Sequence, residues 1–109
     1  MMNNKTVIVA PAIKAHFWKD IYKTLSLGSV PFHIVFVGHI SPSFRLPPNF
    51  THIHCTLNAA ACVEIAFRYA YKHIPDARYI VNISDDLLLH SDFLEELIQF
   101  YNKQIKEQG

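Results

Sequence analysis

Residues 77–101 read ARYIVNISDDLLLHSDFLEELIQFY, and this stretch decides the fold. A mostly apolar run at 79–83 is followed by two adjacent acids, Asp85 and Asp86, and a helix signal opens at Ser91. Carboxylates at the C-terminal end of a buried strand are costly unless a cationic group meets them there. In open α/β sheets, that end of a strand is also where ligands bind. The acidic tip is therefore the first candidate site.

Composition and charge limit the classes of protein to consider. Half of the 109 residues are hydrophobic and 17% are charged, which indicates one globular domain. Ten Lys and Arg balance nine Asp and Glu without a basic block, which argues against nucleic-acid binding. No signal peptide is recognisable, and no run approaches the roughly 20 apolar residues of a transmembrane helix. We expect a cytoplasmic protein, with peripheral membrane attachment as an alternative.

Hydrophobic periodicity predicts four strands and three helices. Short β-branched runs predict strands at 6–10, 32–37, 51–56 and 79–83. Helical spacing of apolar residues predicts helices at 17–27, 58–74 and 91 to about 106. Residues 39–50, which hold three of the six prolines, are predicted to form a loop.

This order predicts a three-layer α/β/α sandwich with a Rossmann-like, mostly parallel sheet of four strands. Right-handed crossovers place the fourth strand beside the first and give the strand order 3-2-1-4. The gap between the tips of the first and fourth strands is then a topological switch point, where open sheets bind ligands. Pro11, Ala12 and residues 84–86 are predicted to lie there.

Three segments resemble the N-terminal, nucleotide-sugar-binding half of a GT-A-type glycosyltransferase of the family-2-like kind. They are VIVAPAI at 7–13, LNAAACVEIAFRYA at 57–70 and NISDDLLLHSDFLEEL at 82–97. The match is closest over 79–98, and the whole chain can be laid on the first half of that fold. Two features depart from it: the second strand ends FVGHIS without an acid, and the long helix reads CVEIAF where relatives have Ala-Arg-Asn.

The resemblance implies a role for each residue that matches the family's motifs. Asp86 would be the main ligand of a Mn²⁺ or Mg²⁺ ion, cations that prefer carboxylate oxygens. Asp85 would lie beside it as a second metal-site and nucleotide-sugar-binding residue, toward the ribose or the metal's waters. The remaining nucleotide-sugar-binding positions would be Pro11 and Ala12 at the base, Asn58 near the base and ribose, and Ser84 where many relatives have the first Asp.

The resemblance also implies an activity, the transfer of a hexose from a UDP- or GDP-sugar to an acceptor hydroxyl. The acceptor-binding half, which carries the general base in inverting members, does not follow within residues 1–109, so no catalytic residue is assigned. We expect residues 1–109 to form a single nucleotide-sugar-binding domain, a fragment or reduced form of a longer enzyme.

Two other functions stay open. The first is a receiver-like or flavodoxin-like module, although receiver domains carry acids after the first and third strands, and here those strands lead into APAI and HCTL. The second is an inactive glycosyltransferase remnant that serves assembly. An exposed edge strand would favour a homodimer.

Several other residues have both a functional and a structural interpretation. His90 could reach a phosphate or the metal, or be merely exposed. His52 and His54 alternate on one face of a strand, a spacing that suits a metal, but a half-exposed edge strand is the better interpretation. A Cys62–His54 nucleophile pair is discounted, because no oxyanion hole accompanies it.

The remaining candidates are aromatic residues and thiols. Trp18 and Tyr22 could stack on a base, and helix packing explains them at least as well. The Phe44-Arg45 segment of the loop could contact a substrate. Cys55 and Cys62 are predicted to be buried thiols.

Overall fold

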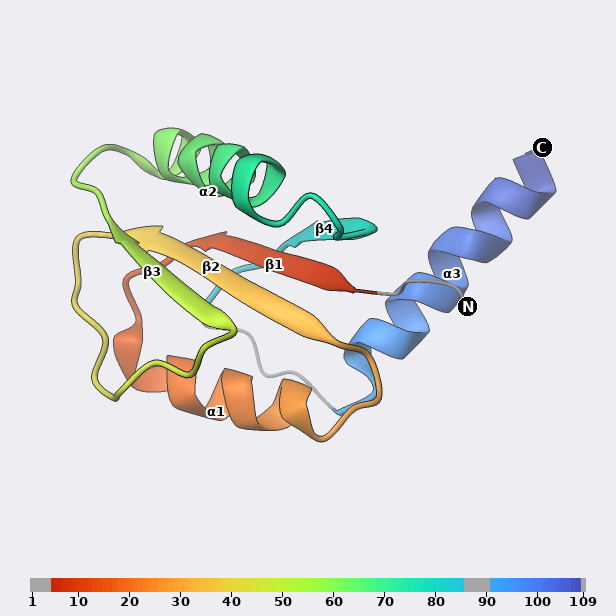
Figure 1. Cartoon of the computed structure of the whole chain (residues 1–109), viewed down its shortest axis with the longest axis horizontal. Coiled ribbons are helices and arrows are strands. Elements are labelled where there is room, and N and C mark those ends of the chain that lie inside the picture. Colours follow the sequence, from red (N-terminus) through yellow and green to blue (C-terminus); the bar gives the residue numbers. More distant parts are fainter. Residues whose placement is uncertain (1–4, 86–90, 109) are drawn as a thin grey trace.

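The computed structural model describes residues 5–85 and 91–108. Its elements are β1 (Thr6–Pro11), α1 (Ala15–Ser26), β2 (Phe32–Gly38), β3 (Phe50–His54), α2 (Ala59–His73), β4 (Tyr79–Asn82) and α3 (Phe93–Gln108) (Figure 1). The predicted element order is confirmed. Most boundaries shift by one or two residues from the predicted ones.

The four strands form one sheet in the order β3-β2-β1-β4, and every pairing is parallel. This confirms the predicted Rossmann-like α/β class and strand order. β1 lies between β2 and β4, and its residues Thr6 to Ala10 are completely buried. A strand covered on both faces needs apolar side chains on both, which explains the unbroken β-branched run in its sequence.

Helices cover both faces of the sheet (Figure 1). α2 lies on one face, where its small residues Cys62, Ala66 and Ala70 meet the valines of β1 and β2. α1 covers the other face with Trp18, whose ring lies 5.5 Å from that of Phe36. Small residues spaced by four along α2 let the helix lie close to the strands.

The loop 39–49 joins β2 to β3 without a helix. Its apolar residues Phe44 and Leu46 pack against the core on the α1 face. The backbone N–H of Ile34 donates to the Asn49 carbonyl, and the Asn49 side-chain amide donates to the Phe32 carbonyl. The loop therefore works as a packed crossover that lets two consecutive strands run parallel.

α3 packs on the α1 side of the sheet through its first turns, and further along it meets β4, where the Tyr79 hydroxyl donates to Asn102 Oδ1 over 3.2 Å. Leu94 and Ile98 are buried, whereas Phe100 and Tyr101 are 62% and 51% exposed. The C-terminal part of α3 projects beyond the strands (Figure 1). In the part of the chain that the structure describes, no helix is long and apolar enough to span a membrane.

The turn between α1 and β2 holds the start of α3. The Ser29 backbone N–H donates to the Glu95 carboxylate over 2.7 Å. A Cβ on Gly28 would lie 2.5 Å from the Ser91 carbonyl oxygen and 3.1 Å from Glu95 Oε1. A side chain at Gly28 would therefore push α3 away from the turn.

We predict that Gly28→Ala lowers the free energy of unfolding by about 1–3 kcal/mol, because the added methyl overlaps the Ser91 carbonyl oxygen just before α3. Urea unfolding measures the loss, and amide hydrogen exchange in α3 should quicken. The neighbouring Leu27→Ala is the control, because Leu27 is 79% exposed. Equal stabilities of the two variants would contradict this account of the α3 contact.

Candidate functional site

The carboxyl ends of the strands meet at one edge of the sheet. Pro11 at the end of β1 pairs with Val37 in β2, and Gly38 at the end of β2 pairs with His54 in β3. The first turn of α2 begins at the same edge, five residues after His54. The predicted residues Pro11, Ala12 and Asn58 are thus brought to one edge by the parallel topology.

A pocket of about 250 Å³ opens at this edge. We call it the edge pocket, and its lining residues are Pro11, Ala12, Ile13, Val37, Gly38, His39, Cys55, Leu57, Ala59 and Cys62. Most of these side chains are apolar, and three separate chain segments after β1, β2 and β3 contribute them. A mostly apolar concave site of this kind is typical of small-molecule pockets.

Gly38 is required by a close approach of two backbones at the pocket. A Cβ on Gly38 would collide with the Ala12 carbonyl oxygen. The Ala12 backbone N–H donates to the Val37 carbonyl over 2.9 Å, and the Cys55 N–H donates to the Gly38 carbonyl over 3.0 Å. These bonds extend the sheet pairing past the ends of β1 and β2 and fix the pocket floor.

Asn58 caps α2 beside the pocket. Its side-chain oxygen accepts a hydrogen bond of 2.9 Å from the Ala61 backbone N–H. The two residues that flank it, Leu57 and Ala59, line the pocket. The side-chain oxygen of Asn58 therefore has a structural role as the N-cap of α2. The resemblance to glycosyltransferases had implied that this residue lies near the base and ribose.

Asp85 points into the protein and is only 5% exposed. Its Oδ2 accepts two hydrogen bonds, one of 2.6 Å from the Lys14 backbone N–H and one of 2.9 Å from Trp18 Nε1. Lys14 is the N-cap residue of α1 and makes no side-chain cap of its own. The carboxylate of Asp85 therefore caps α1 from the end of β4, where the helix dipole also favours a negative charge.

The other acidic-tip residues are placed differently. Ser84 is exposed at the same edge. Asp86 and His90 lie outside the described residues, so the predicted metal ligands stay a prediction. Within residues 5–85 and 91–108, no three His, Cys, Asp or Glu side chains come together to hold a metal ion.

His52 and His54 lie on β3, which is an edge strand as predicted. Burial lowers the pKa of His52, and nearby His54 lowers it further, against a backbone hydrogen bond at Gly38 that raises it. Its Nε2 is buried and has no hydrogen-bond partner among the described residues. His54 is exposed. Packing, with the ring of His52 5.4 Å from Trp18, accounts for His52.

The aromatic candidates belong to the core. Trp18 is completely buried, and Tyr22 donates its hydroxyl to Asn49 Oδ1 over 2.9 Å. Phe44 packs edge-on against Phe50 at 5.7 Å, and Tyr22 also reaches Phe50 at 6.4 Å. Helix and loop packing thus explains the three rings, and only Arg45 of the loop pair is exposed.

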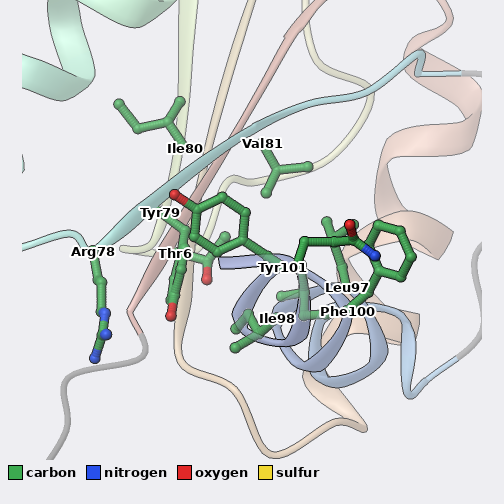
Figure 2. A pocket seen from close by; sticks show the side chains of 11 residues that line it. Thr6, Arg78, Tyr79, Ile80, Val81, Leu97, Ile98, Phe100 and Tyr101 are labelled. Carbon is green, nitrogen blue, oxygen red and sulfur yellow. The ribbon is translucent and has the colours of Figure 1, made fainter. Parts of the chain in front are cut away.

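A second cavity of about 460 Å³ lies between β4 and α3 (Figure 2). Thr6 of β1 and Tyr79 and Val81 of β4 line its strand side, and side chains of α3 that include Leu97 and Ile98 line the other (Figure 2). We call it the β4–α3 groove. It is larger than the edge pocket, but no predicted site residue lines it, and it extends along the sheet's amino-terminal half.

Comparisons with known proteins identify no family. No protein-family model matches the chain, and neither the curated proteins nor the solved structures give a significant match. The chain is a small parallel α/β domain.

The two cysteines are the pocket residues that sequence reasoning missed. Both were predicted to be buried, and both are, yet both also line the edge pocket. Burial and the neighbouring Cys55 thiol raise the pKa of Cys62. The only signal in the sequence was the position of one thiol at a strand end and of the other in the first turn of the next helix.

We predict that Asp85→Ala lowers the free energy of unfolding by about 2–3 kcal/mol, because it leaves two N–H donors without an acceptor at a buried site. Asp85→Asn keeps an acceptor oxygen and should cost less. Trp18 is the only tryptophan, so its emission reports the contact directly. The exposed Ser84→Ala is the matched control; an Asp85→Ala variant as stable as this control would contradict the capping role.

We also predict that the protein becomes less stable in acid. Burial lowers the pKa values of His33 and His52 below the ordinary 6.5, and Lys5 lowers that of His33 further. As the pH falls, these histidines bind protons in the unfolded chain at a higher pH than in the folded chain. Their contribution to the free energy of unfolding is therefore present above about pH 6.5 and is lost as the pH falls through the folded-state pKa values.

Urea unfolding between about pH 7.5 and about pH 5.5 measures this dependence. The double variant His33→Gln, His52→Gln should flatten it relative to the exposed His16→Gln. If the double variant kept the full dependence, buried histidines would not be its source.

Proposed function

We propose that this chain is the nucleotide-sugar-binding domain of a GT-A-like glycosyltransferase, in which the edge pocket takes the base of a UDP- or GDP-sugar. The observation that carries the proposal is the edge pocket itself, since Pro11 and Ala12, the residues matched to the family's base-binding loop, line it. The sheet order 3-2-1-4 supports it, because Pro11 and Ala12 at the end of β1 then border the switch point between β1 and β4.

The proposed roles follow from the residues at that edge. The walls at the ends of β1, β2 and β3 would hold the base, and the exposed Ser84, after β4, would face the sugar and diphosphate. Asp85 would act by positioning, since its Oδ2 already accepts two hydrogen bonds from α1. This leaves Asp86 as the proposed metal ligand, with His90 as a further candidate.

The proposed protein ligands suit a metal ion that is held mainly by the phosphates of its substrate. Mg²⁺ is commonly bound through one or two carboxylates together with substrate phosphates, so an incomplete protein ligand set is compatible with Mn²⁺ or Mg²⁺. When bound, such an ion neutralises the diphosphate as it becomes the leaving group. The chain's own residues would bind the base and fix the direction of the acidic tip. The acceptor and the general base are not assigned.

A second candidate function is an inactive remnant that binds a protein partner. The feature that favours it is the β4–α3 groove, beside which Phe100 and Tyr101 are more than half exposed. Exposed aromatic side chains at an apolar groove are typical of interaction sites. A receiver-like module has less support, since β1 ends at Pro11 and β3 at His54, and neither end is acidic.

Calorimetric titration with UDP and with GDP, each with and without Mn²⁺, tests the proposal. Ala59→Trp should fill the pocket and weaken nucleotide binding at least about tenfold, a loss of about 1.4 kcal/mol. Ala60→Trp is the matched control, because Ala60 is equally exposed on the same helix turn and does not line the pocket. Asp86→Ala should remove the dependence on Mn²⁺.

Three results would contradict the proposal. The first is no binding of either nucleotide, which would favour the remnant. The second is equal weakening by Ala59→Trp and Ala60→Trp, which would place the nucleotide elsewhere. The third is a Mn²⁺ dependence that survives Asp86→Ala, which would remove the metal role from the acidic tip.

A further inference from the structure

Two thiols share the wall of the edge pocket. Cys55 follows the last residue of β3, and Cys62 lies in the first turn of α2. They are 9% and 4% exposed, and both line the pocket. A small molecule that enters the pocket would therefore meet two sulfur atoms, although the rest of each side chain is buried.

Both sulfur atoms contact the same residue, Leu57. The Leu57 backbone N–H donates to Cys55 Sγ over 3.4 Å, and the Cys62 thiol donates to the Leu57 carbonyl over 3.6 Å. Burial and the neighbouring Cys55 thiol raise the pKa of Cys62. Both thiols therefore meet at the Leu57 backbone and line the same pocket.

The backbone holds this turn in place from both ends. The Cys55 N–H donates to the Gly38 carbonyl, and the Cys62 N–H donates to the Asn58 carbonyl, each over 3.0 Å. The Asn58 side chain closes the turn by accepting from Ala61. The sheet and the helix cap therefore fix the sulfurs beside each other without a covalent bond.

We propose that Cys55 and Cys62 form a thiol–disulfide exchange site, which reduces a low-molecular-weight disulfide that enters the edge pocket and becomes an intramolecular disulfide. Cys55 sulfur attacks one sulfur of the small disulfide, whose S–S bond breaks, and the first small thiol leaves with the Cys55 proton. Cys62 sulfur then attacks Cys55 sulfur and expels the second small thiol, which takes up the Cys62 proton. Two protein thiols are oxidised, and one small disulfide is reduced to two thiols.

Exposure and hydrogen bonding assign the order of attack. The rate of exchange depends on which sulfur the small disulfide can reach. Cys55 is 9% exposed and Cys62 only 4%, and the Cys62 thiol also donates its proton to the Leu57 carbonyl. Cys55 is therefore the attacking thiol and Cys62 the resolving thiol.

The test incubates the folded 109-residue chain with glutathione disulfide, then alkylates the remaining thiols and measures intact mass. The expected product is a monomer that has lost two hydrogens and both alkylatable thiols, and that a dithiol reductant restores. Cys62→Ser should stop at one glutathione adduct on Cys55. Cys55→Ser should react at least about tenfold more slowly than Cys62→Ser.

Three outcomes would overturn the proposal: two glutathione adducts on the unaltered chain, disulfide-linked dimers as the main product, or thiols that react only after the chain is unfolded in denaturant. The readout is a mass and needs no nucleotide, so it is independent of the glycosyltransferase proposal. Cys55→Ala and Cys62→Ala keep the assignment testable if a serine variant fails to fold.

Discussion

The contact between Asp85 and the first turn of α1 is the constraint on which the arrangement of the site depends. A buried carboxylate is costly, and here the cost is offset by two N–H donors and by the positive end of a helix. One donor belongs to Trp18, the ring at the centre of the α1-side core, so the contact links the end of β4 to that core.

Much of the fold could be predicted from the sequence, because each element has its own hydrophobic period. β1 is an unbroken β-branched run, β2 is apolar apart from His33, and α2 has small residues at helical spacing. The strand order and the layers then followed from the rules for parallel sheets. The start of α1 was placed two residues late for a physical reason. Its cap is supplied by Asp85, 71 residues away, and nothing local at Lys14 signals a helix start.

The site could be predicted only in part. The edge that gathers Pro11, Ala12 and Asn58 followed from topology, but the inward direction of Asp85 did not, because adjacent acids in a sequence look equivalent. The structure describes the environment of Asp85, whereas Asp86 lies outside the described residues. The thiol wall of the pocket was missed because cysteines are common in cores, and a pocket formed by three chain segments has no sequence signature. Trp18 and Tyr22 differ from the cysteines, because helix packing was already an explanation of both rings from the sequence, and it accounts for both in the structure.

The central claim is that the edge pocket, and not the larger β4–α3 groove, binds a nucleotide with a divalent ion beside the acidic tip. Paramagnetic broadening of backbone amide signals by Mn²⁺ in the presence of UDP or GDP tests it most directly, because it locates the ion without a mutation. The account predicts loss of the amide signals of Ala12, Ile13 and Ser84, with Leu97 and Phe100 in α3 unaffected. Broadening centred on α3, or the same broadening pattern without any nucleotide, would contradict it.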